Sequence, residues 1–144
     1  MTRSVRPQCQ REGFGGFFDG EDDYVTLPDL GEFDAVSMEA WVQFDEISGE
    51  HPVVMEDGWD AGAIHLQILG GNFVLGINGV GDYKFGWQPE ARIWYFVSVQ
   101  YGTKQNKGTI SLSVNNELVD DASKDMGGSF TVKLTYHSTA NTFN

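Results

Sequence analysis

The amino-acid sequence predicts an all-β domain in which two antiparallel sheets pack face to face as a β-sandwich. Apolar and polar residues alternate with a period of two along most of the chain, which is the pattern of strands that bury one face. No segment of helical length carries an apolar stripe at helical spacing. The chain has 18 glycines for turns, and short strands separated by such turns are typical of a two-sheet sandwich.

Two long strands show the alternation most clearly. They lie in DAVSMEAWVQF, residues 34–44, and in IWYFVSVQY, residues 93–101. One face of each strand is apolar and is predicted to face the core, as for Val97, Val99 and Tyr101. The opposite face is mixed, and it carries Ser37, Glu39, Trp41 and Gln43 in the first strand and Trp94, Phe96 and Ser98 in the second.

Two hairpins are predicted from pairs of residues that accept the positive φ angles of a two-residue turn. The turns and their strands are Gly70-Gly71 between residues 64–69 and 72–78, and Asn115-Asn116 between residues 110–114 and 117–119. Shorter strands are predicted at residues 16–19, 24–27, 52–56, 83–87 and 130–134.

The chain of 144 residues has the length of one domain. We expect a single sandwich over residues 14–136, a flexible leader at residues 1–13 and a loose tail at residues 137–144. Cys9 is the only cysteine, so no internal disulfide can form. The N-terminal residues lack the apolar segment of a signal peptide, and no apolar run reaches the roughly 18 residues that span a bilayer.

The charge of the chain is strongly negative and unevenly distributed. The net charge is −12, and residues 12–83 contain 16 Asp and Glu but no Lys or Arg. Such a surface repels phosphate backbones, so nucleic-acid binding is not expected. An excess of carboxylates attracts hard divalent cations, Ca²⁺ first. The alternative is a solvated acidic surface that keeps the protein soluble.

Four stretches of the chain resemble the laminin-G-like domains of the concanavalin A-like lectin/glucanase superfamily, whose fold is a jelly roll. They are FFDGEDDYVTLPDL, FDAVSMEAWVQFDE, IWYFVSVQY and ISLSVNNELV, and they extend from about Gly15 to Val119. Phe96 and Ser98 replace the residues that are commoner in the third stretch, and Asn116 stands where the family prefers glycine. The resemblance implies a lectin-like module and an extracellular or cell-surface location.

The end of the chain departs from this resemblance. Such domains close with a strand that pairs beside the first one, and nothing after Asp125 matches it. Residues 127–144 either supply a divergent last strand or leave a sheet edge open. An open edge tends to pair with another chain, so a homodimer or another protein partner is an alternative to a glycan ligand.

The acidic opening of the sandwich is a candidate metal site. Asp19, Asp22 and Asp23 surround Gly20, and the resemblance implies that Asp19 and Asp22 bind a structural Ca²⁺. Calcium takes 6–8 oxygen ligands, several of which an Asp-rich turn can supply. The alternative is a tight turn in which Asp19 bonds to nearby backbone N–H groups.

Residues 55–62, MEDGWDAG, form a candidate carbohydrate site. Glu56, Asp57 and Asp60 surround Trp59 in a loop bounded by glycines. A tryptophan ring can stack on the apolar face of a sugar while carboxylates accept its hydroxyl protons. The alternative is that Trp59 caps the core and the acidic residues are merely solvated.

A second candidate site lies on the mixed face of residues 34–44. If that strand belongs to a concave sheet, Glu39 and Trp41 would line a groove, which Trp87 could join. The alternative is lateral packing under a loop. Trp94, by contrast, is expected to pack rather than to bind.

Catalysis is not expected. No strand carries the Glu-x-Asp-x-Glu pattern that the glucanases of this fold use, and retaining hydrolysis needs two carboxyl groups about 5–5.5 Å apart. His51, His65 and His137 are isolated from zinc-ligand or triad partners, and His65 is expected on a strand surface. We therefore predict a non-catalytic carbohydrate-binding module for a glycan or polysaccharide. A protein-interaction or self-assembly module is the alternative, and a glycan hydrolase is a lesser one.

Overall fold

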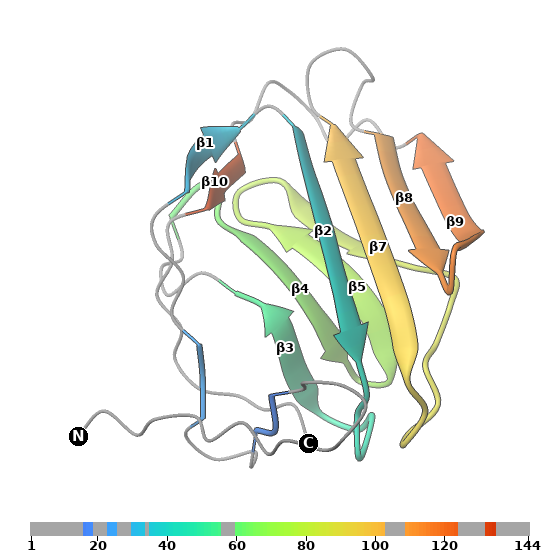
Figure 1. The fold of residues 1–144 in the computed structure, drawn as a ribbon. Coiled ribbons are helices and arrows are strands. Elements are labelled where there is room, and N and C mark those ends of the chain that lie inside the picture. Colours follow the sequence, from blue (N-terminus) through green and yellow to red (C-terminus); the bar gives the residue numbers. More distant parts are fainter. Residues whose placement is uncertain are drawn as a thin grey trace.

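The computed structural model describes residues 16–18, 23–25, 30–33, 35–55, 60–102, 109–123 and 132–134 (Figure 1). Within these ranges the secondary structure is entirely β, and no helix is long and apolar enough to cross a membrane. The strands are β1 (Gly31–Phe33), β2 (Ala35–Val42), β3 (Glu50–Val54), β4 (Ile64–Leu69), β5 (Asn72–Ile77), β6 (Gly81–Lys84), β7 (Tyr95–Gly102), β8 (Thr109–Val114), β9 (Glu117–Ser123) and β10 (Val132–Leu134).

The strands form two antiparallel sheets that lie face to face, so the predicted β-sandwich is confirmed. The front sheet in Figure 1 has the order β2-β7-β8-β9, and the rear sheet has the order β3-β4-β5-β6. A separate two-stranded sheet pairs β1 with β10. The core lies between the front and rear sheets, and its fully enclosed residues include Val97, Val99, Ile110 and Leu112 from the front and Ile64, Ile68, Phe73 and Leu75 from the rear.

Both predicted hairpin turns are present. Gly70 and Gly71 have φ angles of 55° and 81°, and Asn115 and Asn116 have φ angles of 51° and 67°. Positive φ at both central positions is the backbone of a type I′ turn, which asparagine tolerates better than most side chains. Asn115 also bonds to β7, because its Oδ1 accepts from the Phe96 N–H at 3.0 Å and its N–H donates to the Phe96 carbonyl at 2.8 Å.

The end of the described chain supplies a closing strand. β10 pairs antiparallel with β1, with Glu32 opposite Lys133, so the divergent-strand alternative is the one that the structure supports. β1 itself is absent from the sequence prediction. Its three residues are too few to show an alternation, and their strand geometry comes from the pairing with β10.

Strand β6 begins two residues earlier and ends three residues earlier than the predicted strand at 83–87. Gly81 begins it, and after Lys84 only the Phe85 N–H continues toward β5, donating to the Phe73 carbonyl at 3.0 Å. The next N–H, that of Gly86, donates instead to the Asp120 carboxylate at 2.6 Å. The ladder therefore ends where a side chain takes over the backbone donor.

The two strands predicted at 16–19 and 24–27 are not seen in their described parts. Residues 16–18 and 23–25 are not in strand conformation, and the remainder lies outside the described residues. Phe17 is 62% exposed, and Tyr24 and Val25 are also exposed. Phe17, Tyr24 and Val25 therefore lack the burial that would favour strand formation.

The outer face of the rear sheet holds a buried histidine. His65 lies opposite Gly76, and Gly76 lies opposite Asp82 on β6. The imidazole ring lies over Gly76, where a Cβ atom would overlap it, and Nε2 is 3.5 Å from Asp82 Oδ1. His65 is therefore only 8% exposed, and its predicted place on the strand surface is corrected, because the missing side chain of Gly76 makes room for the ring.

A β-bulge in β9 joins the edges of the two sheets. Ser113 pairs with Leu118 and Leu112 pairs with Asp120, so Val119 has no partner in the ladder. The extra residue brings Asp120 to the side that faces the rear sheet. There its carboxylate accepts from the Tyr83 hydroxyl at 3.1 Å as well as from the Gly86 N–H at 2.6 Å.

This junction makes the stability of the domain sensitive to alkaline pH. Burial, the hydrogen bond to Asp120 and the charges of Asp120 and Asp121 raise the pKa of Tyr83 above its ordinary value of 10.0. The pKa of Tyr83 is higher in the folded state than in the unfolded state. The contribution of this tyrosine to the free energy of unfolding is therefore complete below pH 10 and is lost as the pH rises through the folded pKa.

We expect Tyr83→Phe to reduce the alkaline fall in the free energy of unfolding, measured by urea denaturation from pH 8 to pH 11. Burial also raises the pKa of Tyr101, so a smaller fall should remain. An unchanged fall in Tyr83→Phe would contradict the assignment.

Candidate functional site

Most of the outward side chains of the front sheet lie in three rows across the strands. Antiparallel pairing places residues of neighbouring strands directly opposite each other, and successive rows are two residues apart along each strand. The rows are a polar row of Ser37, Gln100, Ser111 and Asp121, a middle row of Glu39, Ser98, Ser113 and Leu118, and an aromatic row of Trp41 and Phe96.

The aromatic row presents a large ring to solvent. Trp41 is 65% exposed, and its ring centroid lies 5.5 Å from that of Phe96 with a tilt of 46°. The backbone of Phe96 is in turn held by Asn115 at the β8–β9 turn. The Trp41 ring is therefore flanked by a second aromatic ring on the neighbouring strand, while most of its surface remains available to a ligand.

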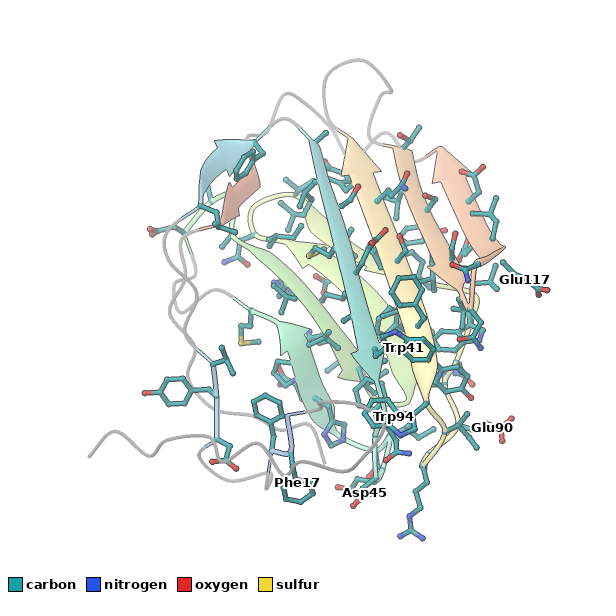
Figure 2. The ribbon with its side chains drawn as sticks, in the orientation of Figure 1. Phe17, Trp41, Asp45, Glu90, Trp94 and Glu117 are labelled. Carbon is teal, nitrogen blue, oxygen red and sulfur yellow. The ribbon has the colours of Figure 1, made fainter. Side chains whose placement is uncertain are left out.

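Trp94 lies at the same end of the molecule as Trp41, beyond the arrowhead of β2 (Figure 2). Its side chain is 52% exposed, which corrects the expectation that it packs. Trp94 immediately precedes the first residue of β7, Tyr95, and therefore lies outside the ladder between β2 and β7.

The middle row carries a carboxylate beside the aromatic row. The Ser98 hydroxyl donates to Glu39 Oε1 at 3.1 Å, and both side chains are accessible to solvent. No other group among the described residues bonds to this carboxylate. Glu39 is therefore oriented through one oxygen and keeps acceptor capacity for a ligand hydroxyl.

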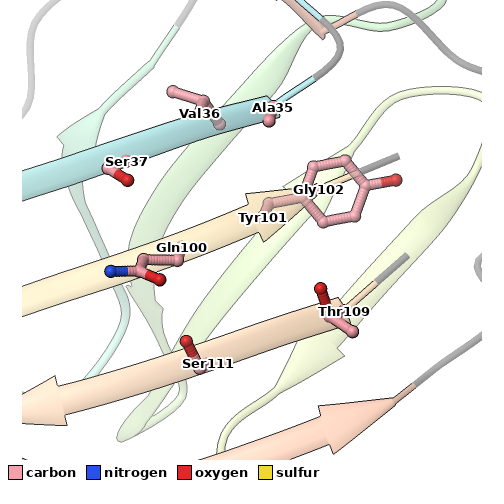
Figure 3. Close-up of a pocket in the computed structure, with 8 residues that line it drawn as sticks. All are labelled: Ala35, Val36, Ser37, Gln100, Tyr101, Gly102, Thr109 and Ser111. Carbon is pink, nitrogen blue, oxygen red and sulfur yellow. The ribbon is translucent and has the colours of Figure 1, made fainter. Parts of the chain in front are cut away.

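The polar row leads into a surface pocket at the other end of the same face (Figure 3). The pocket has a volume of about 240 Å³ and lies where β2 begins, β7 ends and β8 begins. Its outward-facing side chains include the hydroxyl groups of Ser37, Thr109 and Ser111 and the amide of Gln100, and Figure 3 places Ser37, Gln100 and Ser111 on three neighbouring strands. The lining residues are Ala35, Val36, Ser37, Gln100, Tyr101, Gly102, Thr109 and Ser111.

The structure therefore brings Glu39 and Trp41 together, as the sequence pattern suggests, but places Trp87 differently. The Trp87 ring is half-buried against the core and makes edge-on contacts with Phe73, at 5.8 Å and 88°, and with Tyr95, at 5.0 Å and 84°. Trp87 is thus held by the core, and its participation in binding stays a prediction.

The predicted loop site is described only in part. Asp60 is exposed in the connection between β3 and β4 of the rear sheet, where its carbonyl accepts from the Ala63 N–H at 3.0 Å. Glu56, Asp57 and Trp59 lie outside the described residues. The described residues therefore do not give the geometry of this second candidate site.

The predicted calcium ligands are also described only in part. Asp19 and Asp22 lie outside the described residues, whereas Asp23 is described and half-buried. Among the described ranges, no group of three or more His, Cys, Asp or Glu side chains comes close enough to hold a metal ion. Calcium binding near residue 20 therefore stays a prediction.

Phe96, Ser98, Gln100 and Ser111 belong to this face but were not among the predicted site residues. The alternation in residues 93–101 does place Phe96 and Ser98 on the mixed face. The alternation does not predict which strand is the partner or in which register the two strands pair. That register sets Phe96 opposite Trp41 and Ser98 opposite Glu39.

Comparison with known proteins agrees with this architecture. Residues 19–139 match the family model described as the concanavalin A-like lectin/glucanases superfamily, in its laminin-G-like form. The chain belongs to this superfamily. The laminin-G-like resemblance of the sequence motifs is thereby confirmed, and the two four-stranded sheets are its jelly-roll sandwich.

One solved structure similar to this laminin-G-like domain comes from Bacteroides ovatus, and that protein is proposed to bind carbohydrate. The TM-score is 0.53 and the sequence identity is 16%, so the similarity concerns the fold alone. The match covers 72% of this chain and 31% of that chain, which is about a third of its length. No curated protein sequence matches the chain.

Proposed function

We propose that this laminin-G-like domain is a non-catalytic carbohydrate-binding module whose binding face is the outer face of the front sheet. The observation that carries the proposal is the pairing of an exposed Trp41 ring, backed by Phe96, with the Glu39 carboxylate one row away. Folding gains little from a tryptophan left 65% exposed. A ring beside a hydroxyl acceptor suits a sugar, which has an apolar ring face and polar edges.

The chemistry of the face supports binding rather than hydrolysis. Retaining hydrolysis needs two carboxyl groups about 5–5.5 Å apart. Among the described outward-facing residues of β2, β7 and β8, Glu39 is the single carboxylate, and its neighbours in the middle row are serines. The fold is also shared with a Bacteroides ovatus protein that is proposed to bind carbohydrate.

The loop at residues 55–62 is a second candidate location for the same function. Trp59 would stack on the sugar, while Glu56, Asp57 and Asp60 would accept hydroxyl protons. We also propose that Asp19, Asp22 and Asp23 bind a structural Ca²⁺ that stiffens the sandwich and does not contact the glycan.

The alternative, a protein-interaction module, is supported by fewer observations. β10 pairs with β1 in a separate two-stranded sheet, so among the described residues this pairing does not cover β2, which is one edge of the front sheet. The other edge of the front sheet is β9, which carries Glu117, Asp120 and Asp121. Like charges on an edge strand disfavour pairing with a second copy of the same strand.

A glycan array with the purified domain, run once with Ca²⁺ and once with EDTA, tests these proposals together. We expect glycan binding in both runs, because the proposed metal site and the proposed glycan site are separate. In thermal unfolding, we expect EDTA to lower the melting temperature, because it removes the proposed structural metal. Binding that EDTA removes would place the metal in the glycan site. Absence of binding in both runs would contradict the carbohydrate proposal and favour a protein partner.

A further inference from the structure

We infer that this face binds an uncharged glycan chain of about three or more linked sugar rings, laid along β2 and β7 from the Trp41 ring to the pocket at Ser37, Gln100 and Ser111. The inference rests on the proposed function and adds the length and the charge of the ligand.

The length follows from the spacing of the two ends of the face. Trp41 and Ser37 both point outward from β2 and are four residues apart. At the rise of an antiparallel strand this corresponds to roughly 13 Å, a distance that about three linked pyranose rings span. Glu39 and Ser98 lie midway, one row from each end. A single sugar can therefore contact the aromatic row or the pocket, but not both.

The pocket supplies the polar contacts that the aromatic end lacks. The Gln100 amide offers two donors and an acceptor, and the hydroxyls of Ser37, Thr109 and Ser111 can each donate and accept. All four groups are uncharged, and a volume of about 240 Å³ leaves room for one sugar ring rather than a chain. The pocket is thus suited to the terminal sugar of a longer ligand.

The charge of the face selects against acidic glycans. Among the described outward-facing residues of the four front strands, Glu39 and Asp121 are acidic and none is Lys or Arg. Lys84 belongs to the rear sheet, and Arg92 precedes β7 in the connection from β6. A uronate or sulfate group laid on this face would meet Glu39 and Asp121 and, among the residues that the structure describes on the four strands, no cationic partner. The charges of the described face therefore favour a neutral glycan.

The test measures affinity against chain length by isothermal titration. The probes are cello-, manno- and malto-oligosaccharides of one to six rings, with heparin and oligogalacturonate fragments as acidic probes. We expect the affinity for a neutral series to rise at least about ten-fold between two and four rings and to change little beyond. Acidic fragments should bind at least about ten-fold more weakly than neutral chains of equal length.

Substitution of two matched serines on β8 distinguishes the pocket from the rest of the face. Ser111 lines the pocket, whereas Ser113 points outward one row away and does not. We expect Ser111→Ala to weaken tetrasaccharide binding about five-fold, Gln100→Ala to weaken it about ten-fold, and Ser113→Ala to leave it unchanged. Disaccharide binding at Trp41 should be the same in all three variants.

The possible results separate this inference from the function on which it rests. If the wild-type protein binds a disaccharide as tightly as a tetrasaccharide, or if Gln100→Ala binds the tetrasaccharide normally, the extended site is wrong while carbohydrate binding stands. Tighter binding of the acidic fragments would overturn the charge assignment in the same way. Failure of every probe to bind would overturn the proposed function together with the inference.

Discussion

Replacement of Trp41 with alanine is expected to weaken glycan binding by about 2 kcal/mol, or about 30-fold, while the melting temperature stays nearly unchanged. The ring is 65% exposed and rests on Phe96 rather than in the core, so its removal takes away the stacking surface and leaves the core intact. Titration with the best neutral tetrasaccharide measures the affinity, and thermal unfolding followed by circular dichroism measures the stability.

The other tryptophans of the chain serve as matched controls for this experiment. Trp94→Ala removes another exposed ring from the same end of the molecule and should affect binding less, because Trp94 belongs to none of the three rows. Trp87→Ala should instead lower stability by about 3 kcal/mol, since its ring packs against Phe73 and Tyr95.

Trp59→Ala distinguishes the two candidate locations. If the loop at residues 55–62 is the site, Trp59→Ala abolishes binding without loss of stability and Trp41→Ala has no effect. If the outer face of the front sheet is the site, the pattern is reversed. A large loss of stability in Trp59→Ala would instead assign that ring to the core.

Replacement of Gly76 with alanine is expected to destabilise the domain by about 3 kcal/mol, although it adds only one methyl group. The His65 ring occupies the space of the new Cβ atom, and both residues are buried in paired strands. The ring must therefore leave its position near Asp82 or the two strands must separate. Urea unfolding of the variant and the wild-type protein measures the change.

A control and a double variant test the cause of this loss. Gly86→Ala makes the same chemical change where the nearest atom to the new Cβ would be Asp120 Oδ2 at 3.5 Å, an ordinary contact, and should cost little. Adding His65→Ala to Gly76→Ala should recover part of the lost stability, because the ring is then absent. Additive effects of the two substitutions would contradict the contact between His65 and Gly76.

Much of the fold is readable from the sequence because the information is local. The side-chain alternation of a strand repeats every two residues, so the outward direction of Glu39 and Trp41 follows from their own segment. The same holds for the turns, since Gly70-Gly71 and Asn115-Asn116 are pairs that accept positive φ angles. The laminin-G-like motifs add the order of the strands and hence the superfamily.

The candidate site is only partly readable in this way, because a site needs residues from several strands at known positions. The sequence alone determined that Trp41 and Glu39 share an outward face. The tertiary structure decided that Phe96 lies beside Trp41, that Ser98 bonds to Glu39, and that a pocket forms at Gln100. Register and strand order depend on contacts between distant segments, for which a local pattern carries no signal.

The same physical reason explains the errors of the prediction. β1 is a strand because β10 pairs with it, and His65 is buried because Gly76 on the next strand lacks a side chain. The sequence by itself determined the fold class, the turns and the outward direction of Trp41 and Glu39, all of which rest on the local geometry of single strands. The tertiary structure alone decided which strands become neighbours, in which register, and therefore which side chains form one surface.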